Sequence, residues 1–295
     1  RSFIDATGHA DIAFRAGVPV RIGRLQDGAM QPMTLGMSMA PVDLSAMMTA
    51  VGEGNGKAIK PGMDHEDFVW FALNLSPWRE AIEAIGIRLG SRGTCWGNSI
   101  YPRIVNLNAV KIIGLDGADT RELSRAEVAS RRIAVKFADF MRGNVPGFEE
   151  AFITRTSPSI GIRETRHIEG AYVLSDDDAV EGRVPDDSIA LCGYPIDIHD
   201  PKDGVAEFQS VGGGRFGVPY RSLVPRGIGN LLVSGRGISA SDKAFGSVRV
   251  MGTCLAIGEA CAIAARIAQE GNAAIAELDG VAVRHELETA GIMLP

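Results

Sequence analysis

The segment most informative about the architecture is Asn230-Leu231-Leu232-Val233-Ser234-Gly235-Arg236-Gly237-Ile238-Ser239-Ala240. Its apolar run predicts a short buried strand, and the residues after Ser234 form a G-x-G-x-x-A pattern, in which backbone can approach a phosphate closely. A nicotinamide dinucleotide site needs a helix that starts at once and an acidic residue about 20 residues further on, at the end of a second strand. Here the predicted helix starts late and runs through the position of that strand. The context therefore argues against an NAD site.

A long helix is predicted next, over residues 244–269. Small side chains recur at every fourth position of this helix, at Gly252, Ala256, Ala260, Ala264 and Ala268. Such a stripe lets either a sheet or a flat ligand come close to the helix, and the sequence leaves both interpretations open. Near its amino-terminal end lie Arg249, Gly252 and Thr253, where free backbone amides and the positive end of the helix dipole accumulate. That end suits an anionic group, such as the one carried by a reduced flavin.

The rest of the chain indicates one domain interrupted by another. The first residues predict the end of a buried strand, Ser2-Phe3-Ile4, which stops at the turn Asp5-Ala6-Thr7-Gly8. Further on, Ser124 and Glu127 form a capping box that predicts the start of a long helix. The order strand, insertion, strand, helix predicts an α/β chain with an α+β insertion. We expect residues 1–30 and 218–295 to form one domain and residues 31–217 to form the inserted domain.

Composition and charge exclude several classes of protein. The 295 residues are 45% hydrophobic and 22% charged, as in ordinary globular domains. The net charge is −6 with no basic block, so a nucleic-acid partner is not expected. The longest apolar stretch, residues 250–265, is shorter than the roughly 20 residues that span a membrane. The four cysteines form no metal-binding or disulfide pattern, so we expect no metal site and a cytoplasmic location.

Several short segments carry a family resemblance through their order and spacing. These segments are Phe3-Ile4-Asp5-Ala6-Thr7-Gly8, Ala16-Gly17-Val18-Pro19, Gln31-Pro32-Met33-Thr34-Leu35, Pro146-Gly147-Phe148-Glu149, Ile160-Gly161-Ile162-Arg163-Glu164-Thr165-Arg166, Pro195-Ile196-Asp197-Ile198-His199, Pro219-Tyr220-Arg221-Ser222-Leu223-Val224-Pro225, Asn230-Leu231-Leu232-Val233-Ser234-Gly235-Arg236 and Ser247-Val248-Arg249-Val250-Met251. With them the sequence resembles the FAD-dependent oxidoreductases that have a glutathione-reductase-type flavin domain. The resemblance covers nearly the whole chain. It implies FAD as cofactor and a Rossmann-like FAD/NAD(P)-binding domain interrupted by a mixed-sheet substrate domain.

The resemblance also implies which residues contact FAD. They are Ala6, Thr7, Gly8 and Asp11 at one flavin-contacting turn, Gly235 and Arg236 near the ribityl chain and diphosphate, and Arg249, Met251, Gly252 and Thr253 beside the isoalloxazine ring. The sequence departs from the family pattern at His9-Ala10, at Ser241-Asp242-Lys243, where a histidine is common, and at Glu259-Ala260-Cys261-Ala262.

The family's first strand and its glycine-rich phosphate turn would precede Arg1. We therefore expect either that the chain is the C-terminal portion of a longer protein or that a partner chain supplies the rest of the FAD site. A homo-oligomer is also an expected possibility.

The middle of the chain supplies the candidate catalytic residues. If residues 160–168 form a strand, alternation places Arg163, Thr165 and His167 on one face and Glu164 and Arg166 on the other. Glu164 and Arg166 then either pair as a structural brace, or Arg163 or Arg166 anchors a carboxylate or polyol substrate with its guanidinium group.

His199 is the candidate base. The resemblance implies that its segment faces the flavin, and alcohol oxidation requires a group that accepts the hydroxyl proton. Tyr220 and Arg221 are secondary candidates, whereas we assign His167 and His65 to structure or surface.

The sequence thus predicts an oxidoreductase that transfers hydride between FAD and a small hydroxylated or carboxylated substrate. The alternative is a non-catalytic or partial chain that binds substrate and needs a missing segment or a partner subunit to bind FAD.

Overall fold

A computed structural model describes residues 1–58, 69–89, 93–99, 101 and 103–294 of the chain. It is a mixed α/β structure that divides into two compact units. The first unit comprises Arg1–Met30, Glu164–Ile198 and Ala206–Pro295, and the second comprises Gln31–Arg163 and His199–Val205. Residues 164–198 and 206–217, which the sequence prediction placed in the inserted domain, therefore group with the first unit, because their strands pair and pack within it.

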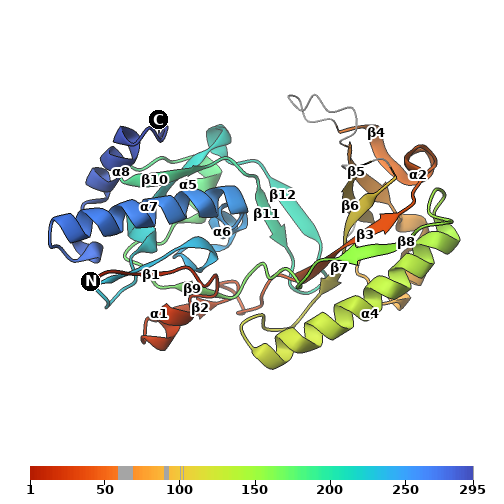
Figure 1. Cartoon of the computed structure of the whole chain (residues 1–295), viewed down its shortest axis with the longest axis horizontal. Helices are drawn as coiled ribbons and strands as arrows, with labels where there is room; N and C mark the ends of the chain where they lie inside the picture. Colours follow the sequence, from red (N-terminus) through yellow and green to blue (C-terminus); the bar gives the residue numbers. More distant parts are fainter. Residues whose placement is uncertain (59–68, 90–92, 100, 102, 295) are drawn as a thin grey trace. The chain divides into compact units, whose positions relative to one another are not determined.

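The first unit contains small sheets rather than one large sheet (Figure 1). Strand β1 (Phe3–Asp5) runs parallel to β14 (Leu231–Val233). Strand β2 (Val20–Ile22) pairs antiparallel with β9 (Arg166–Ile168), and β10 (Ser188–Cys192) pairs antiparallel with β13 (Phe216–Pro219). Strand β11 (Ile196–His199) pairs with β12 (Ala206–Gln209).

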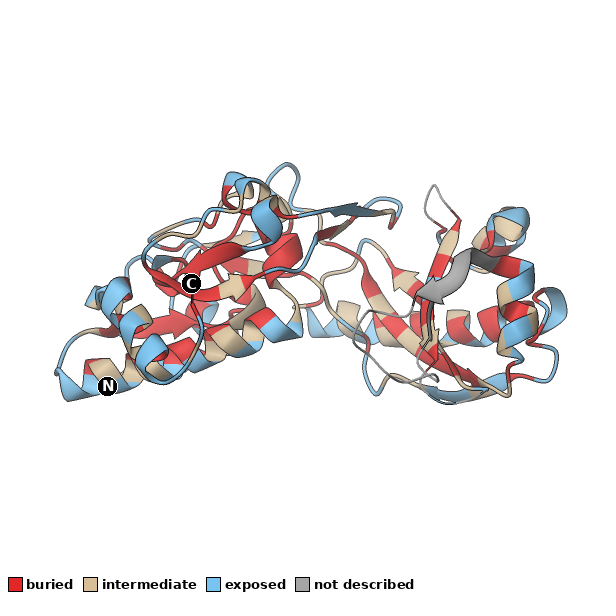
Figure 2. Cartoon of the chain, turned by 90° about the horizontal axis from the view of Figure 1, so that it is seen from above, coloured by how far each residue is buried: buried red, intermediate tan, exposed pale blue. Residues whose placement is uncertain are grey.

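Helices and short 3-10 segments surround these strands. They are α1 (Asp11–Arg15), α5 (Asp176–Glu181), η2 (Gly212–Gly214), η3 (Tyr220–Leu223), η4 (Gly235–Gly237), α6 (Asp242–Val248), α7 (Met251–Glu270), η5 (Ile275–Glu277) and α8 (Gly280–Thr289). The main core of the unit joins the buried faces of β10, β13, α6, α7 and α8. In both units the buried residues run along the strands, whereas the outer faces of the helices are exposed (Figure 2).

The second unit is built on a six-stranded sheet with the order β4-β5-β6-β7-β3-β8. Its strands are β3 (Met33–Ala40), β4 (Gly52–Ala58), β5 (Val69–Asn74), β6 (Thr94–Ser99), β7 (Val105–Ile112) and β8 (Phe152–Thr156). Every pairing in it is antiparallel. Its helical elements are α2 (Leu44–Val51), η1 (Ser76–Trp78), α3 (Arg79–Ala84) and α4 (Thr120–Asn144). Side chains of β3 and β7 alternate between a face packed on α4 and an opposite face, as Leu107 and Phe137 in the shared core show.

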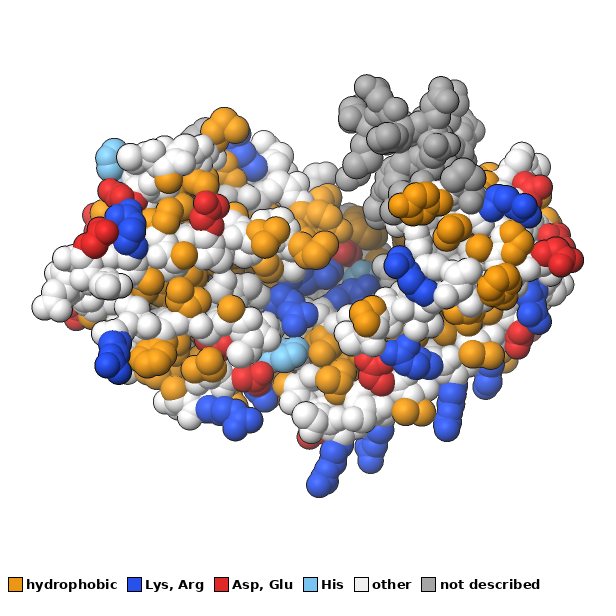
Figure 3. All heavy atoms as spheres, viewed as in Figure 1, with side chains coloured by type: hydrophobic (Ala, Val, Ile, Leu, Met, Phe, Trp, Pro, Cys, Tyr) orange, Lys and Arg blue, Asp and Glu red, His pale blue; other side chains and the backbone are white. Residues whose placement is uncertain are grey.

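Helix α4 begins earlier than the capping box predicts. Asp119 is the N-cap, and its Oδ1 accepts the backbone amides of Arg121 and Glu122 at 2.8 and 3.0 Å. Ser124 instead lies inside the first turns, where its hydroxyl donates to the Thr120 carbonyl at 2.7 Å. An aspartate satisfies the free amides of a helix start as well as a serine does, so the prediction of the N-cap was wrong by about one turn. Lys and Arg side chains project in a row from this helix (Figure 3).

Helix α7 is longer than the apolar stretch considered in the sequence. Among the helices of the described residues it alone is long and apolar enough, by length and composition, to cross a membrane. A core helix passes the same test, and one face of α7, with Ile257, Cys261 and Ala264, is buried in the core of the first unit.

Candidate flavin site

Two turns meet at one edge of the first unit because β1 and β14 are parallel. Their register aligns Asp5 with Val233, and the Ser234 amide donates to the Asp5 carbonyl at 2.8 Å. The carboxyl ends of parallel strands share one edge of a sheet, and ligands of α/β proteins bind in the crevice outside that edge. The predicted segments Ala6-Thr7-Gly8 and Gly235-Arg236 therefore leave their strands side by side.

The first turn is built around the buried carboxylate of Asp5. Its Oδ1 accepts the backbone amide and the hydroxyl of Thr7 at 3.0 and 2.7 Å, and its Oδ2 accepts the Ala13 amide at 2.8 Å. The Thr7 hydroxyl in turn accepts the Asp11 amide at 2.9 Å. One carboxylate thus fixes both the turn and the start of α1, while Ala6 and Thr7 remain exposed at the surface.

The two turns approach each other at Gly8 and Arg236. Gly8 has a φ of +77°, and a β-carbon placed on it would lie 2.8 Å from Nη2 of Arg236. Burial lowers the pKa of the Arg236 guanidinium, and the positive charge of Arg249 acts in the same direction. An anionic group beside Arg236 would offset both effects.

Gly235 leaves open space at the second turn. Its φ is +78°, and a β-carbon on it would meet no heavy atom within 4 Å. A glycine in the left-handed region beside open space is the arrangement in which backbone can approach a ligand closely.

The helix predicted over residues 244–269 is interrupted, which corrects the prediction of one continuous helix. α6 ends at Val248, Val250 is extended with φ −76° and ψ 153°, and α7 starts at Met251. Val250 provides no side-chain cap for the new helix start. Met251, Gly252 and Thr253 therefore lie in the first turn of a separate helix, whose amides point away from the helix body, and Arg249 lies between the two helices.

The surface of this first turn is open and partly apolar. A β-carbon on Gly252 would meet no heavy atom within 4 Å, and the side chains of Met251 and Leu255 are 83% and 74% exposed. Thr253 is buried, and its hydroxyl lies 3.4 Å from the Cys192 sulfur. Contact between Thr253 and a ligand would accordingly come from its backbone.

The two ends of the stripe of small residues on α7 have different surroundings. Ala260, Ala264 and Ala268 are buried in the core, so packing accounts for the distal half. Gly252 lies at the exposed end, where a flat ligand remains the open interpretation.

Arg249 is held by the strand that leads to His199. Its Nη2 donates to the carbonyl and to Oδ2 of Asp197 at 2.8 and 2.9 Å, and its buried Nε has no hydrogen-bond partner among the described residues. A buried N–H without a partner is costly, so this position favours a ligand that accepts a hydrogen bond.

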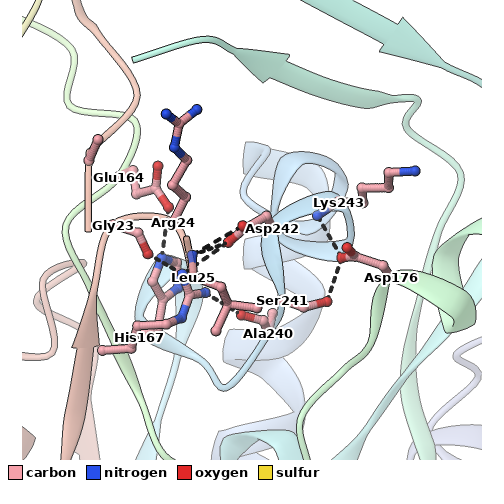
Figure 4. Close-up of polar contacts among 12 residues, drawn as sticks. Gly23, Arg24, Leu25, Glu164, His167, Asp176, Ala240, Ser241, Asp242 and Lys243 are labelled. Atoms are coloured by element: carbon pink, nitrogen blue, oxygen red, sulfur yellow. Dashed lines mark hydrogen bonds and ion pairs between the residues drawn. The ribbon is translucent and has the colours of Figure 1, made fainter. Parts of the chain in front are cut away.

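The loop before α6 is anchored where the family pattern has a histidine (Figure 4). The carboxylate of Asp176 accepts the Ser241 hydroxyl at 2.5 Å and the Lys243 amide at 2.7 Å. Asp242 accepts from Arg21 at 3.0 Å and from the Leu25 amide at 3.2 Å. The residues that depart from the pattern therefore tie the loop to its neighbours.

Arg166 and Glu164 do not pair, which corrects one of the predicted arrangements. Arg166 donates to Asp11 Oδ1 at 2.7 Å and lies over the Phe14 ring at 4.3 Å. Glu164 bonds His167 Nε2 at 3.1 Å, and both side chains are buried. The reason is that β9 begins only at Arg166, so strand alternation does not extend to Glu164.

His167 is a structural residue in this arrangement. Its ring packs edge-on against Phe245 with centroids 4.4 Å apart. Burial lowers the pKa of His167, and this effect outweighs the opposing influence of Glu164.

Arg163 and His199 belong to the second unit. The buried His199 donates its backbone amide to Gln31 Oε1 at 3.0 Å. Arg163 donates to the Pro32 carbonyl at 2.6 Å and to the Thr34 hydroxyl. The segment from Gln31 to Thr34 therefore holds both predicted residues.

The secondary candidates have structural partners. Tyr220 is buried and donates to the Ile275 carbonyl at 2.5 Å, and burial raises its pKa. Arg221 forms two bonds to Asp187, at 2.8 and 3.1 Å. His65 lies outside the described residues.

Sequence reasoning missed two supporting residues. Asp5 directly precedes the predicted site residue Ala6, and Asp197 accepts hydrogen bonds from Arg249. Neither aspartate was assigned a role from the sequence. A signal existed for Asp5, since an aspartate that ends an apolar strand before Thr and Gly is typical of a side-chain-capped turn.

The residues of the first unit fit FAD. Arg236 and the partnerless Nε of Arg249 suit anionic or hydrogen-bond-accepting groups, Gly8 and Gly235 leave backbone accessible, and the first turn of α7 offers amides beside an apolar surface. These features match a diphosphate and a flat, partly polar ring system.

A protein family matches the chain over most of its length. No curated protein matches the chain. No solved structure matches it either. The family described as FAD dependent oxidoreductase matches residues 1–287. The chain therefore belongs to the FAD-dependent oxidoreductase family, and FAD is the cofactor that this membership implies.

Proposed function

We propose that the enzyme transfers hydride between FAD and a small polar substrate that carries hydroxyl or carboxylate groups, and that its first unit is a Rossmann-like flavin domain. The observation that carries this proposal is the meeting of Gly8, Gly235 and Arg236 beyond the carboxyl ends of β1 and β14. Family membership supplies the reaction class.

Bound FAD would accept or donate the hydride. Oxidation of an alcohol also requires a base for the hydroxyl proton, and His199 is our candidate because imidazole changes charge near neutral pH. Arg163 is the candidate anchor for the hydroxyl groups of a polyol substrate. Arg166 is bonded to Asp11 beside the flavin turn, so its proposed role is to position that turn.

A pair of glycine variants tests the flavin site. Gly235 and Gly227 both have positive φ, +78° and +86°, and a β-carbon on either meets no heavy atom within 4 Å. Gly235→Ala and Gly227→Ala should therefore cost similar backbone strain, about 1–2 kcal/mol of unfolding free energy. Only Gly235→Ala should weaken FAD binding, which is measured by titrating flavin fluorescence. Equal FAD affinities in the two variants would refute the placement of the flavin at this turn.

A second candidate function is a chain that needs a partner to complete its FAD site. The observation that favours it is the exposed apolar surface of β1 and α1, where Phe3 is 54% exposed and Ile4, Ile12 and Phe14 are also exposed. Parallel strands are normally covered on both faces, so a further segment or a partner chain would cover this surface. The visible spectrum of the purified chain separates the candidates. Flavin absorbance that remains after gel filtration with added FAD favours the first, and its absence favours the second.

A further inference from the structure

The sheet of the second unit has one face that α4 does not cover. Along β7, Val105, Leu107 and Ala109 are buried in the core, whereas Asn106 and Asn108 alternate with them on the opposite face. Strand β6 repeats this pattern, since Cys95 is buried and Trp96 is exposed. An antiparallel sheet with one packed face normally carries scattered polar residues on the other. Here the opposite face instead gathers amides around a hollow.

A pocket of about 560 Å³ opens on this face. The lining residues that matter here are Ser38, Trp96, Asn98, Asn106, Asn108 and Arg155. The volume lies within the usual range for small-molecule sites, about 300–1,000 Å³. Like most such sites the pocket is chiefly apolar, and its three asparagines supply polar groups that a ligand with several hydroxyl groups can bond.

A chain of hydrogen bonds orients these amides. The Ser38 hydroxyl donates to Asn106 Oδ1 at 2.6 Å, and Asn106 Nδ2 donates to Asn98 Oδ1 at 2.9 Å. The chain crosses three neighbouring strands, β3, β7 and β6. It uses the oxygen of Asn98, so the Asn98 Nδ2 group keeps its donors for a ligand. Asn108 is exposed, and its amide has no hydrogen bond to other described residues.

Trp96 and Arg155 add two further kinds of contact. Trp96 is 43% exposed at the pocket and presents a broad apolar surface, on which the C–H face of a sugar ring can pack. Arg155 is exposed and carries the charge among the described lining residues, which include no acidic side chain. A guanidinium group in this setting recognises a carboxylate with two parallel hydrogen bonds.

We infer that this pocket binds an acidic sugar, a polyhydroxylated molecule with one carboxylate. Neighbouring hydroxyls are bonded by the amides of Asn98 and Asn108, the ring packs on Trp96, and the carboxylate pairs with Arg155. That the pocket binds an acidic sugar does not depend on the proposed function. That this sugar is the substrate of the enzyme does rest on it.

Isothermal titration calorimetry of the full chain tests the inference with D-glucuronate, D-galacturonate and D-gluconate, and with D-glucose and acetate for comparison. We expect at least one polyhydroxy acid to bind more tightly than both comparison ligands. Arg155→Gln should weaken its binding about tenfold or more and leave D-glucose unchanged, since charge-assisted bonds are the stronger ones. Trp96→Ala and Asn108→Ala should weaken both sugars. Arg132→Gln, at an exposed position on α4 of the same unit, is the matched control. It should leave the affinity for every one of these ligands unchanged.

The possible outcomes are distinct. The inference is overturned if none of the three acids binds, or if Arg155→Gln binds the best acid as tightly as the wild type while circular dichroism shows both folded. Binding of an acidic sugar without flavin reduction by it would leave the inference standing and refute its role as substrate. Flavin reduction by some other molecule, with no sugar acid bound, would support the proposed function and refute the inference.

Discussion

Gly8 and Arg236 are 228 residues apart in the sequence and lie so close that a β-carbon on Gly8 would fall 2.8 Å from the Arg236 guanidinium. The backbone of the turn at Gly8 therefore packs directly against the side chain of Arg236 from the other turn. The parallel pairing of β1 with β14 brings them together.

A double-mutant cycle measures this relationship. Gly8→Ala should destabilise the protein by the strain of a positive φ, about 1–2 kcal/mol, and by the displacement of Arg236. In an Arg236→Ala background only the strain should remain, which gives a coupling between the two sites of about 0.5–3 kcal/mol in urea unfolding. Gly17→Ala is the control for strain, because Gly17 has a φ of +88° and no atom within 4 Å of its β-carbon position. Additive effects of the two changes would contradict the predicted contact.

The turn that follows β1 should depend on the charge of Asp5. Asp5→Asn replaces one carboxylate oxygen, which accepts a hydrogen bond, with an NH2 group, which can only donate one. A buried N–H that donated to that oxygen then loses its partner. We expect a loss of about 1–3 kcal/mol in unfolding free energy, with weaker FAD binding. Asp43 also accepts two backbone amides, from Ser45 and Ala46 at 3.0 Å, but at an exposed position. Asp43→Asn should have a smaller effect on stability, and a larger one would argue against a special role for the buried carboxylate.

The burial of His167 predicts a loss of stability in mild acid. Its pKa is lowered in the folded state, so the unfolded chain takes up the proton first as the pH falls below about 6.5. The contribution of neutral His167 to the free energy of unfolding is therefore complete above that pH. Below it the free energy of unfolding falls, by at most about 1.4 kcal/mol per pH unit, until the pH reaches the lower pKa that His167 has in the folded state.

Chemical unfolding from pH 7.5 to pH 5 measures this effect. His167→Gln keeps a donor for Glu164 but cannot take up a proton, so its unfolding free energy should fall less steeply over the range. Parallel curves for the two proteins would show that another group is responsible.

The proposed base makes a kinetic prediction. His199→Gln should lower kcat by about 10²–10⁴, because the hydroxyl proton then has no acceptor, while FAD binding stays unchanged. His285 is exposed on α8, and His285→Gln is the control. Turnover at the wild-type rate in His199→Gln would exclude His199 from the reaction.

The parts of the site that were predictable from sequence are those that neighbouring residues determine. The turn after the first strand and the strand before Gly235 follow from local apolar runs and turn residues, and both occur within one residue of the predicted bounds, with Asp5 ending β1 instead of opening the turn. The break at Val250 was not predictable in this way, because the apolar pattern continues across it. Contacts distant in sequence accompany the break, namely the bonds of Arg249 to Asp197.

The same limit applies to the second unit. Asn106 and Asn108 alternate with apolar residues in β7, which indicates a strand with one face out of the core. That their amides gather with Asn98 and Arg155 depends on the strand order β6-β7-β3-β8. A single sequence does not reveal strand order, so the pocket was missed.

The parallel pair of β1 and β14 has a consequence for the way the chain folds. Most of the second unit is one continuous segment, Gln31–Arg163, so its contacts can form while the chain is still being synthesised. β1 is synthesised before the second unit but finds its pairing partner only after Leu231–Val233 have been made. The closing of such a long loop is a slow step. The flavin side is thus expected to form after the second unit, and during that interval the apolar side chains of β1 are open to chaperones.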